Sequence, residues 1–239
     1  MKCFDEYVFN YDMKDPDINY KYYHSYRVMD IMELLSKKLN LSSKDVYLAK
    51  VIGLLHDIGR FEQDKLYGSF KDGKFDHGDY GVTVLKENNF LDNFDIEKED
   101  YEVVYKAVDN HNQFKINEDL NEREILFAKL IRDADKLDIL YALGNPEIKD
   151  LLKQDEEEIS KELEINFFNE IPCNVNYVNS KNDTLVIIFA YVYDINFKET
   201  YKIIHENKYY DIIYQIINRK DIFKPYIEYT NKYIEERID

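Results

Sequence analysis

The feature that most constrains the fold of this 239-residue chain is the spacing of its apolar residues, which recur every three or four positions along almost its whole length. Strand-like alternation of apolar and polar residues is rare. A period near 3.6 residues is typical of helices that bury one face, whereas half-buried strands show a period of two. The sequence therefore predicts an all-α fold, a helical bundle with additional C-terminal helices packed on it.

Two helices are predicted within the first 60 residues. The segment 22–39, "YYHSYRVMDIMELLSKKL", has one apolar stripe and is followed by Asn40 as a stop signal. The segment 42–59, "SSKDVYLAKVIGLLHDIG", opens with a serine capping signal at Ser42 and ends at Gly59. These segments are expected to be the first two helices of the bundle.

The later parts of the chain are also expected to be mostly helical. The segment 64–77 is the exception, because its glycines and polar residues predict a loop. A flexible connection is the favoured interpretation of this loop, and a mobile lid that includes Lys71 and Lys74 is the alternative. In the tail, β-branched residues leave a strand possible for 184–197 and 208–217. The helices predicted after this loop are 78–90, 98–112, 121–142, an acidic helix over 153–164, and then 184–197 and 208–217.

Gly144 and Pro146 interrupt the helical pattern and suggest a division of the chain. We expect one domain over residues 1–145, and a helical extension over 146–239 that belongs to the same globular unit. No internal repeat or low-complexity linker separates them.

The charge and cysteine content narrow the classes of function and location. A net charge of −16 argues against binding to nucleic acid polymers or anionic membranes, since both require a cationic surface. The two cysteines, Cys3 and Cys173, indicate no disulfide framework, and no apolar stretch reaches 18 residues. The expected location is the cytoplasm, and the sequence does not indicate the oligomeric state.

Four of the five histidines lie before Gly144, each at the start or end of a predicted helix. Taken alone, each is best explained as a surface or capping residue. Together with two aspartates they form an ordered series of nitrogen and oxygen ligands without sulfur, which indicates a metal site. The series is His24, His56, Asp57, His77, His111 and Asp135.

Burial gives the physical argument for that site. The string "VIGLLHDIG" is apolar around most of the helix, so His56 and Asp57 should face the interior. A buried carboxylate without a partner costs several kcal/mol, so a cation is expected beside it. An ion lying off the helix end could be reached by both residues. His24 and Asp135, from neighbouring helices, would complete its coordination.

A second ion is expected near the first. His77 and His111 could hold it, with the two oxygens of Asp57 bridging the pair. Mixed nitrogen and oxygen ligands suit Fe or Mn best, while Zn, Ni, Mg and Co stay possible. Such a pair lowers the pKa of a bound water and clamps substrate oxygens.

The order His…His-Asp…Asp on consecutive predicted helices, with the strings "HSYRV", "LLHDIGR" and "RDADKLD", resembles the HD-domain superfamily of metal-dependent phosphohydrolases. The resemblance covers residues 20–142. It implies an all-helical fold in which His24, His56, Asp57 and Asp135 bind the first metal ion.

His77 and His111 are similar to the extra histidines of binuclear branches of that superfamily. These branches include diadenosine tetraphosphate hydrolases, cyclic-dinucleotide phosphodiesterases, and di-iron oxygenases that act on inositol or phosphonates. The cyclic-dinucleotide branch that carries a Gly-Tyr-Pro motif is disfavoured, because "GYP" is absent and a single histidine stands at 111.

Three further residues are candidates for the active site. Arg60 follows Asp57 by three positions and could bind a phosphate bidentately. The resemblance supports this role, because HD phosphohydrolases commonly have a Lys or Arg at this position. Lys136 could approach the same phosphate, and Asp138 could hydrogen-bond a ligand imidazole. A surface salt bridge or a solvated helix face is the alternative for each.

The expected function is hydrolysis of a phosphate ester or anhydride in a small, nucleotide-like substrate by metal-activated hydroxide. Asp57 or Asp138 could relay the proton. The same ligands also fit a di-iron oxygenase acting on a small polyol or phosphonate, so the ligand set alone does not separate the two. A binding or sensory module that keeps the metal for stability is a third alternative, disfavoured by the intact ligand set and by Arg60.

Overall fold

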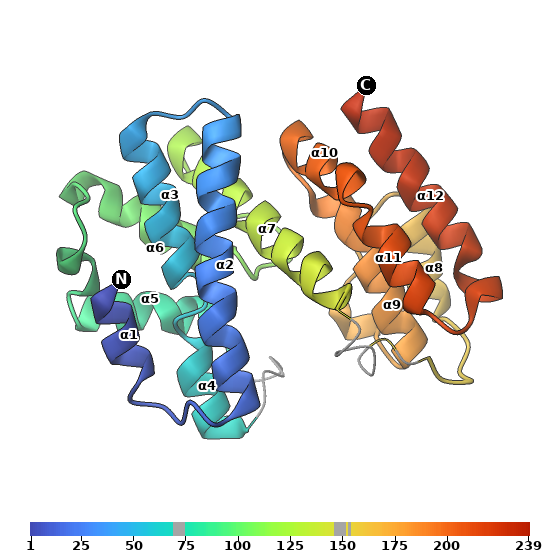
Figure 1. Cartoon of the computed structure of the whole chain (residues 1–239), viewed down its shortest axis with the longest axis horizontal. Coiled ribbons are helices and arrows are strands. Elements are labelled where there is room, and N and C mark those ends of the chain that lie inside the picture. The colour runs from blue at the N-terminus through green and yellow to red at the C-terminus, as the bar shows by residue number, and fades with distance from the viewer. Residues whose placement is uncertain (69–74, 146–151, 153) are drawn as a thin grey trace. The chain divides into compact units, whose positions relative to one another are not determined.

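The computed structural model describes residues 1–68, 75–145, 152 and 154–239. Every regular element in these ranges is helical, which confirms the all-α prediction (Figure 1). The chain forms two compact units, Met1–Ala134 and Asp135–Asp239. Among the described residues, no helix combines the length and the apolar character needed to cross a membrane.

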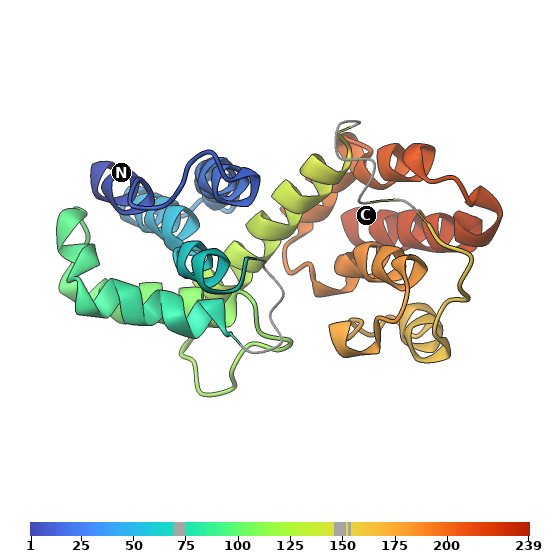
Figure 2. The ribbon, with the colours of Figure 1, turned by 90° about the horizontal axis from the view of Figure 1, so that it is seen from below.

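The described part of the first unit contains two packed pairs of helices, the N-terminal helix α1, a short helix α4 and the first part of α7 (Glu122–Leu143). Its helices are α1 (Lys2–Val8), α2 (Pro16–Lys38), α3 (Ser43–Leu55), α4 (Arg60–Tyr67), α5 (His77–Glu87) and α6 (Tyr101–Asn110), with 3-10 helices at Phe90–Asn93 and Lys98–Asp100. α2 packs along α3, and α5 packs along α6, with α3 also against α6 (Figures 1 and 2). α4 contacts α2 and α5 and so links the two pairs.

The α2–α3 pair buries apolar residues three and four positions apart on each helix. The side chains buried with this spacing on the two helices include Val28, Met32, Leu35, Leu48, Ile52 and Leu55. Burying each such side chain contributes about 1.5–3 kcal/mol before entropy losses. This spacing explains why the periodicity in the sequence identified the two helices.

α2 begins earlier than the sequence suggested. The side chain of Asp15 accepts a hydrogen bond from the amide of Asp17 at 2.8 Å, and Pro16 occupies the first helical position. Asn40, with φ of 56°, follows the helix as the predicted stop. His24 therefore lies in the interior of α2, which corrects the expectation that it stands at a helix end.

The first residues of the loop predicted over 64–77 are helical, so that prediction is wrong there. α4 ends only at Gly68, which has φ of 61° and caps the helix in the left-handed region. Phe61 of α4 is fully buried and contacts the ring of Phe4, with centroids 6.0 Å apart. A helix of eight residues is too short to show a clear period in the sequence.

α7 (Glu122–Leu143) carries the boundary between the two compact units within its length. The sequence instead suggested a boundary after this helix, at residue 145, and that division of domains stays a prediction. The lysines of the predicted lid, Lys71 and Lys74, lie outside the described residues.

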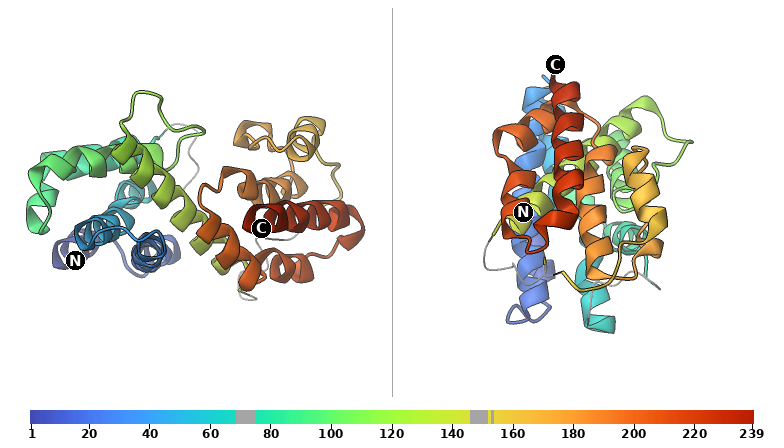
Figure 3. Two further views of the ribbon diagram at one scale, coloured as in Figure 1. Left: turned by 90° about the horizontal axis from the view of Figure 1, so that it is seen from above. Right: turned by 90° about the vertical axis from the view of Figure 1, so that its right-hand side faces the viewer.

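The second unit contains five further helices in its described part. They are α8 (Lys161–Phe168), α9 (Lys181–Ala190), α10 (Lys198–Glu206), α11 (Tyr209–Ile216) and α12 (Lys220–Ile238), with 3-10 helices at Val175–Tyr177 and Tyr191–Asp194. α12 packs against α9, α10 and α11, and α8 packs on α9 (Figure 3). The segment 184–197, for which a strand was possible, is helical for most of its length.

The acidic helix predicted over 153–164 is wrong in its described first half, because α8 begins only after Ser160. The amide and the hydroxyl of Ser160 each donate to the carboxylate of Asp183 at 2.7 Å. The side-chain amide of Asn182 donates to the carbonyl oxygen of Glu157 at 2.6 Å. These side chains at the start of α9 satisfy backbone groups that a helix would have used, so tertiary contacts override the local propensity.

Candidate metal centre

The first pair of candidate ligands comes from two helices that pack closely. His24 lies inside α2 and His56 is the C-cap of α3, and both side chains are fully buried. Their Nε2 atoms are 3.2 Å apart. Gly53 permits this approach, because a Cβ there would lie 2.8 Å from the Cα of Met29. Two ligands at right angles, each about 2.1 Å from one ion, have donor atoms about 3 Å apart, so the rings fit a shared cation.

The ring of His56 is oriented by its own helix. Its Nδ1 lies 2.8 Å from the carbonyl oxygen of Gly53, in the last turn of α3. A carbonyl oxygen only accepts hydrogen bonds, so Nδ1 carries the hydrogen and Nε2 presents a lone pair. This is the tautomer that a metal ligand requires, and the hydrogen bond at Nδ1 raises the basicity of Nε2.

The second pair, His77 and His111, shows the same arrangement. His77 is the first residue of α5, His111 is the C-cap of α6, and both are buried. Their Nε2 atoms are 3.1 Å apart. The Nδ1 of His111 donates to the carbonyl oxygen of Val108 at 2.5 Å, which again leaves the lone pair at Nε2.

Asp57 lies between the two pairs and is 2% exposed. Its Oδ2 atom is 3.4 Å from Nε2 of His24 and 3.5 Å from Nε2 of His56. Its Oδ1 atom is 3.4 Å from Nε2 of His77 and 3.3 Å from Nε2 of His111. One buried carboxylate therefore presents a separate oxygen to each histidine pair.

Gly59 allows α5 to come close to Asp57. A Cβ at this position would collide with the backbone carbonyl oxygen of His77 and would lie 2.9 Å from the amide nitrogen of Gly81. Any side chain here would push away the first turn of α5, and the imidazole of His77 with it.

Asp76 joins the residues around His77 to those that follow His111, and the sequence interpretation did not identify it. Its Oδ1 accepts hydrogen bonds from the first-turn amides of α5 and from the side chain of Asn112 at 2.9 Å. Its Oδ2 accepts from Gln113 at 2.9 Å. Burial would raise the pKa of Asp76, but these donors hold it below its usual value. Its position directly before His77, as a helix N-cap, was a usable signal in the sequence.

Asp135 reaches the first histidine pair from α7. It is half-buried, and its carboxylate, with a ring nitrogen from each of His24 and His56, forms a group of ligand atoms within 4.8 Å of one another. Asp135 directly follows Ala134, the last residue of the first unit, on the same continuous helix. The role of Asp135 as a ligand of the first ion stays a prediction.

Lys21 is a second functional candidate that the sequence interpretation missed. Its ammonium is 2.6 Å from Oδ2 of Asp57, and its side chain is only 13% exposed. Burial alone would raise the pKa of Asp57, but the charge of Lys21 and contacts with the surrounding histidines hold it well below its usual range. The signal was available, because Lys21 precedes His24 by three residues and therefore lies on the same side of α2.

Of the three further site residues predicted from the sequence, Arg60 lies beside the candidate metal ligands. Its Nε is 3.6 Å from Oδ1 of Asp57, and its Nη1 donates to Gln63 at 2.8 Å. Lys136 places its ammonium 2.6 Å from the carboxylate of Asp194 in the second unit. Asp138 is fully buried on α7. Contact of Lys136 with a phosphate, and of Asp138 with a ligand imidazole, stay predictions.

Arg132, within the string "RDADKLD", ties α7 to the end of α6. Its Nη1 donates to the carbonyl oxygen of Asn110 at 2.9 Å and to that of Gln113 at 2.5 Å. Because Asn110 directly precedes His111, this buried guanidinium fixes the backbone on both sides of a candidate ligand.

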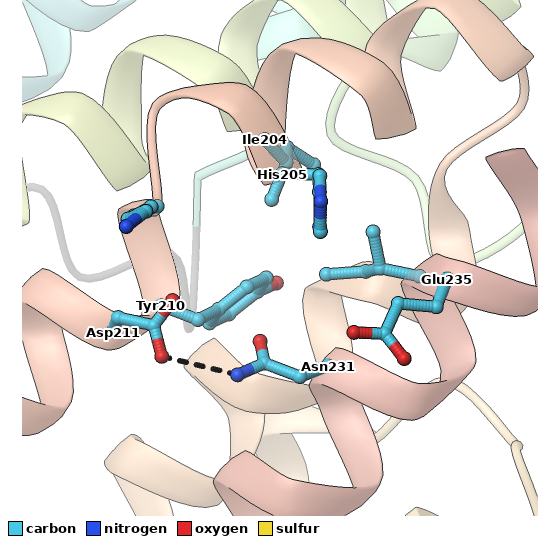
Figure 4. A pocket seen from close by; sticks show the side chains of 8 residues that line it. Ile204, His205, Tyr210, Asp211, Asn231 and Glu235 are labelled. Carbon is cyan, nitrogen blue, oxygen red and sulfur yellow. Dashed lines mark hydrogen bonds between the residues drawn. The ribbon is translucent and has the colours of Figure 1, made fainter.

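The fifth histidine, His205, lies apart from these ligands. It is exposed and lines a pocket formed by α10, α11 and α12, in which Asn231 donates to Asp211 at 3.1 Å (Figure 4). Among the described residues, His205 belongs to no group with the spacing of metal ligands. Its interpretation as a structural residue stays a prediction.

The donor atoms of the centre suit divalent metal ions. Imidazole nitrogens and carboxylate oxygens converge there, and no sulfur atom is among them. Two groups have the spacing of metal ligands: His24, His56 and Asp135 form one, and His56, Asp57 and His111 form the other. This mixture fits borderline ions such as Fe, Mn and Zn. The oriented Nε2 lone pairs of His56 and His111 and the low pKa of Asp57 leave these three residues in the protonation states that such ions bind.

The comparisons with known proteins agree with this geometry. Residues 22–140 match the family model described as "HD domain", and all six candidate ligands lie inside this range. No curated protein and no solved structure gives a significant match to the chain. HD domains bind divalent metals and most act as metal-dependent phosphohydrolases, so a metal-dependent hydrolase activity is supported. Through the matched region and the histidines and aspartates that it contains, this chain belongs to the HD-domain superfamily.

Proposed function

We propose that this protein is a phosphohydrolase that binds two divalent metal ions and cleaves a phosphate ester or anhydride in a small, nucleotide-like substrate. The observation that carries the proposal is the position of Asp57. Each of its two oxygens lies 3.3–3.5 Å from the Nε2 atoms of a different histidine pair. A carboxylate in this position can be shared by two ions.

The two ion positions divide the ligands into two sets. The first would be held by His24, His56 and Asp135 with Oδ2 of Asp57, and the second by His77 and His111 with Oδ1. When bound, two divalent ions supply Lewis acidity to a phosphoryl group and lower the pKa of a coordinated water.

The side chains around the ligands support chemistry on an anionic phosphate. The protein has a net charge of −16, so a phosphorylated substrate needs a local excess of positive charge. Arg60 and Lys21 provide it, because both lie within 4 Å of the Asp57 carboxylate. A guanidinium can bind two phosphate oxygens at once, so Arg60 is the candidate for orienting the substrate.

Burial of the ligands strengthens these electrostatic interactions. The side chains of His24, His56, His77 and His111 are at most 2% exposed. In such a site the effective dielectric constant is lower than in water, so cationic groups act more strongly on developing negative charge. The low pKa of Asp57 keeps it ionised at neutral pH, ready to bind cations.

The proposal also accounts for the size of the substrate. The acidic surface disfavours a nucleic acid polymer or an anionic membrane, whereas a small phosphate compound needs only the local cations of the site.

The decisive experiment combines metal analysis with a phosphate-release screen. Protein purified without oxygen should be loaded with Mn²⁺ or Fe²⁺ and tested on nucleotides, dinucleotides and sugar phosphates. Activity should disappear in Asp57→Ala and persist in His205→Ala, a control that removes the exposed histidine of the second unit. A mixed-valent di-iron centre that consumes oxygen and releases no phosphate would instead support the oxygenase alternative.

A further inference from the structure

We propose that Asp15, Asp17 and Asp64 form a separate cation site in the first unit, suited to a hard divalent ion, Ca²⁺ or Mg²⁺. Asp15 caps the N-terminus of α2, Asp17 lies in its first turn, and Asp64 lies in α4. The site shares no residue with the metal centre. The inference does not depend on the proposed function.

The three carboxylates lie close enough to share one ion. One oxygen from each lies within 4.8 Å of the others. Ca²⁺ binds oxygens at about 2.3–2.6 Å, so oxygens on opposite sides of the ion are up to about 5 Å apart. A set of only carboxylate oxygens selects hard cations rather than the borderline metals expected at the histidines.

The second observation is the environment of Asp64. Asp64 is only 7% exposed. Among the described residues, no hydrogen-bond donor or cation contacts its carboxylate. Burial, together with the negative charges of Asp15 and Asp17, raises the pKa of Asp64. Buried ionised carboxylates are normally paired or coordinate metals, so Asp64 points to an ion between the three residues.

Other carboxylates in this unit have donors. Glu33 on α2 accepts from Lys37 at 2.6 Å and pairs with Lys50 at 2.5 Å. Asp5 accepts from the hydroxyls of Tyr22 and Tyr26 at 3.1 and 2.6 Å. The cluster at Asp64 differs because its three carboxylates lie close to one another. The hydrogen bond that Asp15 accepts, from the amide of Asp17 at 2.8 Å, comes from within the cluster.

An ion at this site would join the two helices that frame part of the metal centre. α2 carries His24 and α4 begins at Arg60, and the two helices are in contact. Neutralising the like charges of Asp15 and Asp17 at the start of α2 and of Asp64 on α4 would stabilise that contact. The site would thus act on the stability of the first unit, with Asp64 as a positioning residue for α4.

The test measures Ca²⁺ and Mg²⁺ binding to chelator-stripped full-length protein by calorimetry, together with thermal unfolding. Wild type should bind one ion per chain at this site, with a melting temperature that rises with ion concentration. Asp64→Asn and Asp17→Asn should each lose this binding and the shift, whereas Asp57→Asn and the exposed control Asp30→Asn should keep both. Whichever ion binds more tightly identifies the cation.

The outcomes are separable from those of the metal centre. Without any ion, Asp64→Asn should melt at or above wild type, because one of three repelling charges is removed. If Asp64→Asn does not fold, the exposed Asp17→Asn decides alone. Absence of saturable binding, binding that survives Asp17→Asn, or binding lost only in Asp57→Asn would each overturn the proposal.

Discussion

The ammonium of Lys21 lies 2.6 Å from Oδ2 of Asp57, the same oxygen that faces the Nε2 atoms of His24 and His56. A positive charge from the chain thus occupies the space beside the buried carboxylate. An ion that binds to His24, His56 and Asp57 has to compete with this ammonium, so Lys21 should control both the stability of the metal-free protein and its affinity for metal.

Lys21→Met should therefore have two opposite effects. Removing one partner of a buried ion pair should cost the metal-free protein about 3 kcal/mol of unfolding free energy. Metal affinity should rise, because the competing cation is gone. Urea unfolding of stripped protein and competition with a chelator measure the two quantities. Lys50→Met, which breaks the pair with Glu33, should leave metal affinity unchanged. Equal affinity in Lys21→Met and wild type would exclude competition.

His111→Ala should lower the metal content from about two ions per chain to about one. The ion held by His24 and His56 keeps its own ligands, so content should not fall to zero. Elemental analysis of reconstituted protein provides the measurement, and His205→Ala is the matched control. Unchanged stoichiometry in His111→Ala would refute the assignment of a second ion to His77 and His111.

Gly59→Ala should displace α5 and lower occupancy of the second ion. The added methyl meets the backbone of His77, and such overpacking costs about 1–3 kcal/mol. Gly68→Ala offers a comparison, since nothing lies within 4 Å of its Cβ position and only its left-handed backbone is strained, at about 1–2 kcal/mol. We expect both variants to lose a similar amount of unfolding free energy, and only Gly59→Ala to lose metal. Denaturant unfolding and metal analysis of the two proteins measure these effects.

Arg60→Gln should weaken substrate binding without emptying the metal centre. A charge-assisted hydrogen bond to phosphate contributes about 1.5–3 kcal/mol, so KM should rise by about tenfold or more. Steady-state kinetics on the substrate found by the screen, with metal content measured in parallel, tests this. Arg123→Gln removes a guanidinium that pairs with Asp45 and Asp100 and should leave KM unchanged. Metal loss in Arg60→Gln would show that Arg60 orients Asp57 instead.

Asp183 should make the second unit sensitive to acid. Burial would raise its pKa, but the amides of Ser160 and Asn179 and the hydroxyl of Ser160 lower it. Because the folded pKa is lowered, this stabilisation is complete above the ordinary value of about 4 and is lost as the pH falls through the folded value. Asp183→Asn should cost about 1–3 kcal/mol at neutral pH and flatten the acid dependence in urea unfolding between pH 3 and 7. Asp221→Asn, an exposed site on α12, should do neither.

The helices that the sequence predicted well are those with long apolar stripes. α2, α3 and α7 each exceed twelve residues and repeat their apolar positions several times. α4 was missed because eight residues around Phe61 repeat the pattern too few times. The first half of 153–164 was assigned to a helix because no local signal reveals that Asp183, more than twenty residues away, takes the amide of Ser160.

The candidate ligands could be selected from the sequence because their residue types and order are informative by themselves. Their neighbours could not. Lys21 is ordinary in sequence, and only its distance from Asp57 distinguishes it from a solvated lysine. Asp76 acts through Asn112 and Gln113, more than thirty residues away, so its role depends on α5 and the end of α6 meeting in space.

The placement of ligands at helix ends makes the two proposed ion positions unequal. His56 ends α3 and His111 ends α6, so each position faces the carbonyl end of a helix, where the macrodipole is negative and favours a cation. The position at His111 also faces the amide end of α5, which begins at His77 and is positive. The helix fields therefore reinforce cation binding at the first position and partly cancel at the second.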